Sequence, residues 1–246
     1  MELPRDCAII DTAPALYQPD LDAIIVADLH IGIESVQARQ GMLMPKVQTQ
    51  EIGEELLDLK DAVGASRLIV AGDVKHSFGA KGTKQREELR VFFDGISPAF
   101  ETIDLVRGNH DSGLETLAED YTNINVIDSV QENEIAVVHG HKRFEMTDCE
   151  MVIFGHEHPA IELKDDAGVT EKISCFLHGG FSMDVIVLPA FSPLASGTAI
   201  NGMPRSELLS PILRNRFDPS EMYVTGIDRE AGMFEFPELS KIQNAQ

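Results

Sequence analysis

The sequence of 246 residues predicts an α/β protein whose first part holds a largely parallel β-sheet. Apolar runs rich in β-branched residues recur between turn signals, and segments with helical spacing separate the first three runs. Alternation of strand, helix and strand implies right-handed crossovers and parallel pairing. After residue 158 the helical pattern mostly ends and short strand-like segments follow.

Short continuous apolar runs are typical of strands buried on both faces. We expect such strands within residues 23–32, 67–76, 102–111, 134–142 and 151–159. Residues 47–64 and 83–96 should form helices, because their apolar residues fall on one face. These residues are Ile52, Leu56, Leu59 and Val63 in the first segment, and Leu89, Phe92, Phe93 and Ile96 in the second.

Beyond residue 158 we expect short strands joined by turns, with a hairpin connection at residues 165–168. They are residues 160–164, 171–179, 184–189, 221–227 and 231–236. The longest loop-like stretch is 192–211, but strands continue after it. We therefore expect residues 1–246 to form a single domain.

No apolar run approaches the ~20 residues of a membrane helix. The N-terminal residues lack the charged and apolar regions of a secretory signal. Three cysteines (Cys7, Cys149 and Cys175) stand at unrelated spacings without a CxxC pair, which favours reduced thiols and excludes a cysteine-based zinc finger. We expect a soluble cytoplasmic protein without a membrane partner; the sequence leaves its oligomeric state open.

Acidic residues dominate the charge, with 41 acidic and 20 basic side chains and a formal net charge of −21. Such a surface repels nucleic acids at low salt. Either the substrate is not a long polyanion, or a high-salt cytoplasm screens the repulsion. Residues 75–86, here called the basic loop, contain four basic and no acidic residues. That loop either handles an anion or is simply solvated.

Residues of metal-ligand type follow each of the five early strands. In α/β sheets, ligands and catalytic groups gather at the carboxyl ends of strands, so we expect these residues to meet at one edge. The stretch LVRGNHD (105–111) alone could be a Gly-Asn turn, but five such strand ends predict a site. The residues are Asp28, His30, Asp73, Asn109, His110, His139, His141, His156 and His158.

The spacing and chemistry of these residues favour two metal ions. Asp28 and His30, like His156 and His158, are i, i+2 pairs whose side chains point the same way in an extended chain. A glycine before Asp73 lets the backbone approach a buried ion. Oxygen and imidazole ligands without thiolate suit Mn²⁺ foremost, with Fe, Zn²⁺ or Ni²⁺ as alternatives. Seven ligands from among these nine residues would be too many for one tetrahedral ion and match two ions that share a carboxylate.

The motifs DLH, GD, GNHD, HGH and GHEH, in this order between residues 28 and 158, resemble the calcineurin-like metallophosphoesterase superfamily. The forms GDVKHSFG and LPAFSPLASGTAIN are similar to an archaeal branch that is grouped with double-strand-break repair nucleases. The resemblance implies a four-layer αββα sandwich, with two mixed β-sheets flanked by helices. The later strands would belong to the second sheet.

The resemblance also implies a role for each site residue. His110 would be a general acid and not a ligand, and Asp111 would orient it by a hydrogen bond. Arg107 would grip the phosphate, unless it is an ordinary surface arginine. Asp28, His30 and His158 would hold one ion, Asn109, His139 and His156 the other, and Asp73 would bridge them.

Four further residues have open or structural roles. Lys75 and His76 stand where many relatives have aspartate or asparagine, and they either contact substrate or serve as supporting or solvated groups. We expect His141 to lie near the metals without binding them. His178 is most simply a buried histidine with a hydrogen bond.

The leading functional hypothesis is hydrolysis of a phosphate ester, with a phosphodiester favoured over a monoester by resemblance alone. A hydroxide bridging the ions would attack phosphorus while His110 protonates the leaving alkoxide. The alternative is a nuclease on DNA or RNA, which the basic loop supports and the acidic charge opposes. A non-catalytic interaction subunit of the same fold is disfavoured, because every ligand position and His110 are filled.

Overall fold

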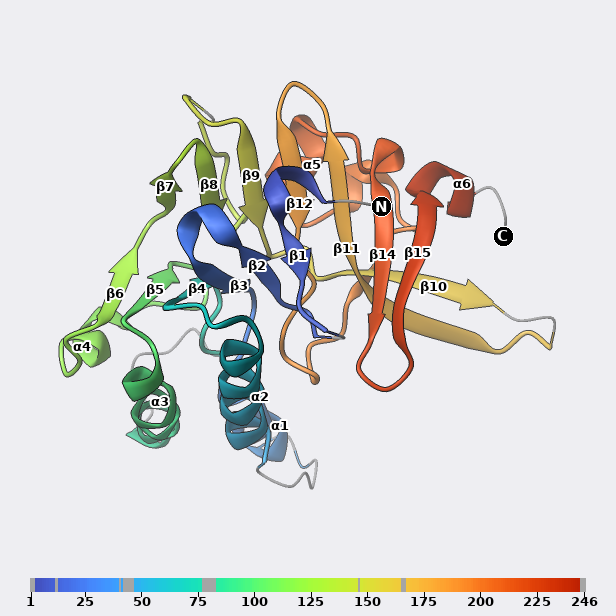
Figure 1. Ribbon diagram of the computed structural model, residues 1–246. Helices are drawn as coiled ribbons and strands as arrows, with labels where there is room; N and C mark the ends of the chain where they lie inside the picture. Colours follow the sequence, from blue (N-terminus) through green and yellow to red (C-terminus); the bar gives the residue numbers. More distant parts are fainter. Residues whose placement is uncertain are drawn as a thin grey trace.

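The computed structural model describes residues 3–11, 13–39, 41, 47–76, 83–145, 147–164 and 167–243. Two β-sheets pack face to face, and helices cover the outer face of each (Figure 1). This is the predicted αββα sandwich of two mixed sheets. None of the described helices is long and apolar enough to cross a membrane.

The first sheet has the strand order β1-β2-β3-β4-β5-β6. Strands β3 to β6 pair in parallel, and β1 and β2 are added to them in antiparallel pairing. The three buried runs expected in this region therefore lie side by side. The strands are β1 (Ala8–Ile9), β2 (Leu16–Gln18), β3 (Ala23–Val26), β4 (Arg67–Ala71), β5 (Thr102–Val106) and β6 (Ile124–Ile127).

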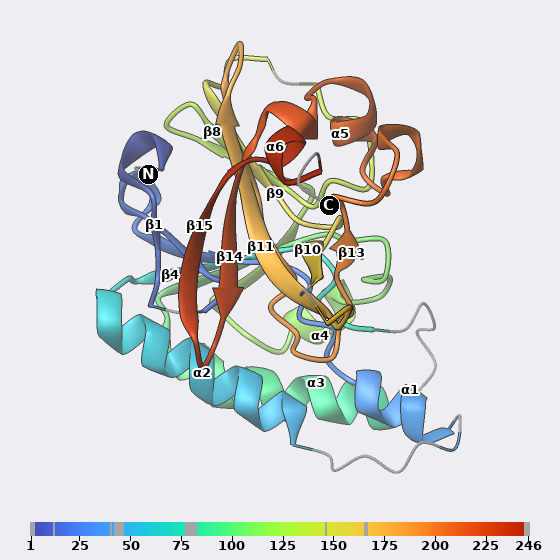
Figure 2. The same cartoon turned by 90° about the vertical axis from the view of Figure 1, so that its right-hand side faces the viewer.

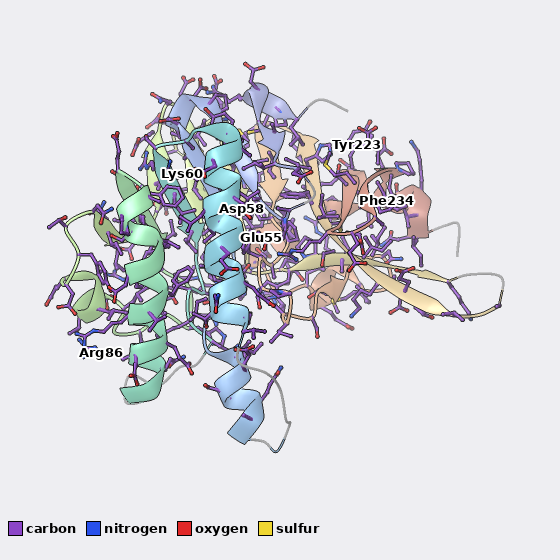
Figure 3. The ribbon with its side chains drawn as sticks, turned by 60° about the horizontal axis from the view of Figure 1, so that its bottom comes forward. Glu55, Asp58, Lys60, Arg86, Tyr223 and Phe234 are labelled. Atoms are coloured by element: carbon purple, nitrogen blue, oxygen red, sulfur yellow. The ribbon has the colours of Figure 1, made fainter. Side chains whose placement is uncertain are left out.

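Helices α1 (Ile33–Arg39), α2 (Gln48–Val63) and α3 (Thr83–Ile96) lie along the outer face of the first sheet (Figures 1 and 2). The expected apolar faces of α2 and α3 are confirmed, because the predicted residues are buried in the core except Val63, which is partly buried against it. The side of α2 turned away from the core carries Glu55, Asp58 and Lys60 (Figure 3). A short helix, α4 (Glu115–Ala118), precedes β6.

The second sheet has the strand order β13-β10-β11-β12-β9-β8-β7, with β14 paired to β11 and β15. Helices α5 (Pro211–Asn215) and α6 (Leu239–Gln243) pack on its outer face. Strands β10 and β11 form the expected antiparallel hairpin. The strands are β7 (Val130–Glu132), β8 (Ile135–Val138), β9 (Met151–Phe154), β10 (Pro159–Lys164), β11 (Thr170–Gly180), β12 (Asp184–Val187), β13 (Thr198–Ala199), β14 (Tyr223–Asp228) and β15 (Gly232–Glu238).

The expectation that all five early strands end at the edge of one sheet is wrong. Strands β8 and β9 belong to the second sheet, because the chain after β6 starts a new sheet with the antiparallel pair β7–β8. Short 3₁₀ helices complete the connections, at Pro4–Asp6, Pro19–Leu21, Ser97–Ala99, Arg205–Glu207 and Pro219–Glu221.

Successive residues of each central strand point into different apolar cores. Ile24 and Val26 of β3 pack toward the helices, whereas Ile25 packs between the sheets, together with Ile153 of β9 and Ile186 of β12. Successive side chains of a strand point to opposite faces, so a strand between two apolar layers must be apolar throughout. This is why the sequence shows continuous apolar runs.

Replacing Phe93 by alanine should lower the free energy of unfolding by about 3–5 kcal/mol, because the ring is fully buried between α3 and the first sheet. The control is Val91→Ala on the same helix, where the side chain is 65% exposed. It should change stability by less than about 0.5 kcal/mol. Urea unfolding followed by circular dichroism measures the stability of both variants. Equal unfolding midpoints for the two variants would contradict the packing of α3 on the sheet.

Candidate metal centre

Two groups of carboxylate and imidazole side chains lie where the strands of both sheets end. In each group the potential ligand atoms lie within 4.8 Å of one another, so that each group can hold a metal ion. The first consists of Asp28, His30 and His158, and the second of Asp73, His139 and His156. The structure thus brings together residues from the ends of β3, β4, β8 and β9.

The loops that carry these residues have an unusual backbone. Five residues have positive φ angles, a region that costs energy for residues other than glycine. They are Asp28 (58°), His30 (47°), Asp73 (46°), His156 (67°) and His158 (46°). The extended conformation expected for the i, i+2 pairs is therefore wrong, although both pairs contribute to the site.

Cross-loop hydrogen bonds hold this backbone in place. The N–H of Asp28 donates to the carbonyl of Gly72 at 3.0 Å, and the N–H of His30 donates to the carbonyl of Asp73 at 3.0 Å. Ile31 then forms an isolated parallel bridge with Lys75. The loops after β3 and β4 thus remain paired beyond the sheet, which places Asp28, His30 and Asp73 next to one another.

Two glycines make room for the side chains of the site. A Cβ atom at Gly72, whose φ is 89°, would overlap the ring of His139, and one at Gly108 would overlap the carboxylate of Asp73. The glycine before Asp73 therefore accommodates His139, where we expected close approach of the backbone to an ion. Any larger residue at either position would displace a candidate ligand.

The carboxylate of Asp28 is fully buried among positive partners. Its Oδ2 lies 3.3 Å from Nε2 of His158 and accepts the N–H of His156 at 2.9 Å. Burial acts to raise the pKa of Asp28, but His158 and His139 outweigh it and hold that pKa below its usual value. The pKa of His158 is raised, because the pull of Asp28 outweighs burial.

Two buried atoms of the first group have no hydrogen-bond partner among the described residues. They are Oδ1 of Asp28 and Nδ1 of His30. Buried polar atoms without partners are costly, so such atoms imply a missing ligand. Burial lowers the pKa of both His30 and His156 to about 4, which keeps these imidazoles neutral and able to bind a cation. The residues present fit a divalent ion.

Asp73 of the second group lies between His139 and His110. Its Oδ2 is 3.4 Å from Nε2 of His139 and 3.8 Å from Nε2 of His110, and its Oδ1 accepts the N–H of His110 at 2.9 Å. Despite burial, His139 and His110 hold the pKa of Asp73 far below its usual value. Burial opposes the charge on His139, but Asp73 and Asp28 raise its pKa to about 9. Asn109 Oδ1 lies 3.2 Å from Nε2 of His139.

The ring of His110 is oriented by a backbone group. Its Nδ1 lies 2.7 Å from the carbonyl oxygen of His76, and the two rings stack with centroids 6.0 Å apart. The carboxylate of Asp111 accepts hydrogen bonds from the N–H groups of Gly108 (2.8 Å) and Lys75 (3.2 Å). Asp111 therefore ties the loop after β5 to the loop after β4. We expected Asp111 to orient the ring of His110 by a hydrogen bond, but the ring contacts the carbonyl oxygen of His76 instead.

Arg107 lies at the rim of the site and is ion-paired. Its Nε is 2.8 Å from Glu115 and its Nη1 is 3.0 Å from Asp128. It lines a cavity of about 310 Å³ that His139 and His141 also line. Its expected contact with a phosphate stays a prediction.

His141 and His178 lie where we expected them, the first near the candidate metal ligands and the second in a buried position with a hydrogen bond. The ring of His141 is 4.9 Å from that of His139, and burial lowers the pKa of His141 to about 4. His178 is buried, and its Nε2 is 3.3 Å from the hydroxyl of Thr225. Burial also lowers the pKa of His178 to about 4, as for a neutral structural histidine.

The basic loop is described only in part. Lys75 is buried, which lowers its pKa, and Arg86 donates to the carbonyl of Thr116 at 3.3 Å. Lys81 and the side chain of Lys84 lie outside the described residues. The anion-handling role predicted for this loop stays a prediction.

Sequence reasoning missed the residues that support the site from a distance. The N–H of Ser192 donates to the carbonyl of Asp28 at 3.3 Å, and its hydroxyl accepts from Nε2 of Gln48. Glu157 lies between two candidate ligands in sequence, is fully buried and accepts the N–H of Ser210 at 2.8 Å. The position of Glu157 in GHEH could have indicated its role; nothing in the sequence marks the others.

Several solved structures are similar to this chain, to different degrees. A nuclease MPE from Pseudomonas putida is 21% identical with a TM-score of 0.59, over 91% of this chain and 92% of that chain. The phosphoesterase Yfce from E. coli is 14% identical with a TM-score of 0.38, over 88% and 98% of the two chains. A protein of unknown function from Aquifex aeolicus is 18% identical with a TM-score of 0.35, over 55% and 77%.

None of the curated proteins matches this sequence, and the archaeal branch stays a prediction. The family model described as the calcineurin-like phosphoesterase superfamily domain matches residues 21–176. That segment contains both groups of metal-binding side chains. With its αββα fold and this match, the chain belongs to the calcineurin-like phosphoesterase superfamily.

Proposed function

We propose that the protein hydrolyses a phosphate ester, and preferentially a phosphodiester, at a dinuclear metal centre. The observation that carries the proposal is the position of Asp73, whose carboxylate contacts both His139 of the second group and the candidate acid His110. Two divalent ions, with Mn²⁺ favoured, would supply charge that neutralises the phosphate oxygens and acidifies a water molecule.

Each ion would take ligands from both sheets. Asp28, His30 and His158 would hold one ion, and Asn109, His139 and His156 would hold the other, with Asp73 shared. The paired loops, and the space that Gly72 and Gly108 leave for His139 and Asp73, would fix these side chains before an ion arrives. Preorganisation of this kind reduces the reorganisation that binding requires.

His110 is proposed as the general acid. Its Nδ1 faces a carbonyl oxygen, which can only accept a hydrogen bond, so a proton must reside on Nδ1. A second proton, on Nε2, is then the one available for the leaving alkoxide. After the transfer the ring is neutral and still donates from Nδ1 to His76, so its orientation does not change.

Asp111 and Arg107 have supporting roles in the proposal. Asp111 holds the loops after β4 and β5 together through two backbone N–H groups, and thereby positions His110. Arg107 lines the cavity beside His139, where its guanidinium would contact a phosphate oxygen of the substrate.

A nuclease is the second candidate function. The observation that favours it is a concentration of cations beside His139, in a chain that is otherwise acidic. The similar fold of the Pseudomonas putida nuclease is compatible with this candidate. A small phosphodiester substrate tests the metal centre alone, because its hydrolysis does not depend on a surface that binds a polymer.

Replacing Asp73 by asparagine should reduce the content of both metal ions, because a shared carboxylate serves each of them. The control is Asp104→Asn, which changes another buried aspartate whose partners are Arg67 and Asn125. Elemental analysis of the protein after equilibration with Mn²⁺ should find close to two equivalents in the control. A content of two metal equivalents in Asp73→Asn would show that the two ions do not share Asp73.

Replacing His110 by asparagine should slow hydrolysis about 10²- to 10⁴-fold and leave the metal content intact. The loss should be smaller for nitrophenyl esters than for alkyl esters, because nitrophenolate leaves without a proton. The control His178→Asn changes a buried histidine near Tyr223 and should leave the rate unchanged. A His110→Asn protein without metal would identify His110 as a ligand.

A further inference from the structure

Two adjoining cavities lie beside the metal centre. The first, of about 310 Å³, contains His139 and His141 in its wall and extends to Arg143 and Phe144. The second, of about 300 Å³, shares Arg143 and Phe144 with the first and ends at Arg216. Because Arg143 and Phe144 line both cavities, the two adjoin, and their joint lining, here called the track, extends from a candidate metal ligand to α5.

The charge of this track contrasts with that of the whole chain. Its described lining contains Arg107, Lys142, Arg143 and Arg216 but only one carboxylate, Asp128, and that one is paired with Arg107. Lys142, Arg143 and Arg216 are exposed and form no ion pair with any of the described residues. Three uncompensated cations at one place attract an anion.

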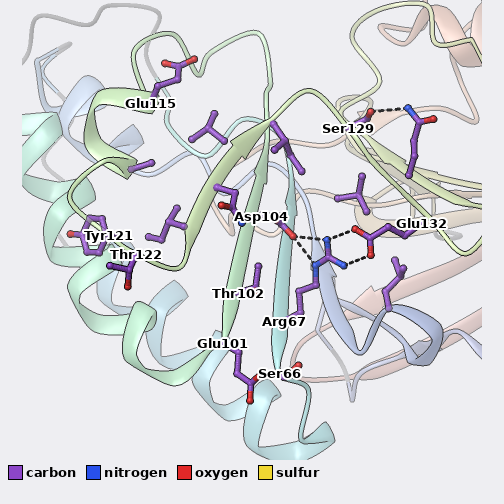
Figure 4. Close-up of a pocket in the computed structure, with 18 of the residues that line it drawn as sticks. Ser66, Arg67, Glu101, Thr102, Asp104, Glu115, Tyr121, Thr122, Ser129 and Glu132 are labelled. Carbon is purple, nitrogen blue, oxygen red and sulfur yellow. Dashed lines mark hydrogen bonds and ion pairs between the residues drawn. The ribbon is translucent and has the colours of Figure 1, made fainter.

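Another cavity shows that this charge is not general. The largest described cavity, about 1090 Å³, is lined by five carboxylates and a single cation, Arg67, which Asp104 and Glu132 already neutralise (Figure 4). A polyanion would be repelled there. In a chain of 41 acidic and 20 basic residues, only the track beside the metal centre, among the described cavities, is predominantly basic.

The track also contains an aromatic ring. Phe144 is half-buried, packs on the core between the second sheet and its helices, and lines both cavities. Cations that follow a backbone, combined with an aromatic ring on which a base can stack, are the features of sites for single-stranded nucleic acids. Each cavity is near the lower end of the range for small ligands, roughly 300–1,000 Å³.

We propose that Lys142, Arg143 and Arg216 bind the phosphates next to the scissile one in a single-stranded oligonucleotide, with a base against Phe144. This inference rests on the proposed phosphoesterase function and specifies its substrate class. The net charge of −21 then opposes binding elsewhere on the surface, and the track directs the strand toward the metal centre.

The test compares two triple variants with the same change of charge. The first is K142Q/R143Q/R216Q; the control is K60Q/K164Q/K241Q, whose residues lie on α2 (Figure 3), on β10 and on α6. Binding of a fluorescein-labelled phosphorothioate oligo-dT, whose backbone resists cleavage, is measured by anisotropy with Mn²⁺ across a salt series. The single variant R143E provides a second measure, because Arg143 lines both cavities.

The first triple variant should bind weakly and with a flatter salt dependence. Three phosphate contacts at about −0.7 each change the slope of log K against log salt by about 2. Over a fourfold rise in salt the wild type should therefore lose roughly 20-fold more affinity than this variant. The control triple should retain the wild-type slope.

Hydrolysis of bis(p-nitrophenyl) phosphate with Mn²⁺, measured in parallel, separates this inference from the proposed function. The first triple variant should keep that activity, because the small diester has no neighbouring phosphate. No oligonucleotide binding by the wild type, an unchanged slope in the triple variant and R143E, or equal loss in the control would each overturn the inference. A wild type inactive on the small diester would instead overturn the proposed function.

Discussion

The burial of two carboxylates within reach of each other is the constraint on which the site depends. Asp28 and Asp73 are both shielded from water, and neither can stay ionised there without positive partners. His158 and His139 supply that charge in the structure, and divalent ions would supply more of it. The local strain and close packing around these two residues follow from keeping them together.

The left-handed loops show how the fold meets this constraint. In an ordinary extended loop successive side chains would point to opposite faces, and only residues i and i+2 would point to the same one. Positive φ angles at Asp28, His30, Asp73, His156 and His158 turn each chain sharply and direct its ligands inward. Their strain is offset by hydrogen bonds between the loops and by the packing of two sheets, which give the backbone no easier path.

The acidic surface and the basic track would act in opposite ways on a polyanionic substrate. Acidic residues outnumber basic ones in the chain, and the large cavity lined by carboxylates would repel a polyanion. The cations of the track lie where the chain between β8 and β9 meets α5, so the second sheet contributes both candidate metal ligands and the surface that would carry a substrate to them. A substrate drawn along that surface would reach the metal centre from the side of His139.

The sequence by itself predicted the longer buried strands, the two main helices and every residue of the two groups that could hold a metal ion, because apolar periodicity and ligand types are local properties. It did not indicate strands β1, β2, β6, β7 and β13. The tertiary structure decided which sheet each strand joined, since pairing depends on contacts between distant segments. It also decided that a carbonyl of His76 faces His110, that Gly72 accommodates His139, and that Lys142, Arg143 and Arg216 meet. Residue types do not reveal where backbone groups point, and Arg143 and Arg216, 73 residues apart, come to share one surface only when the chain folds.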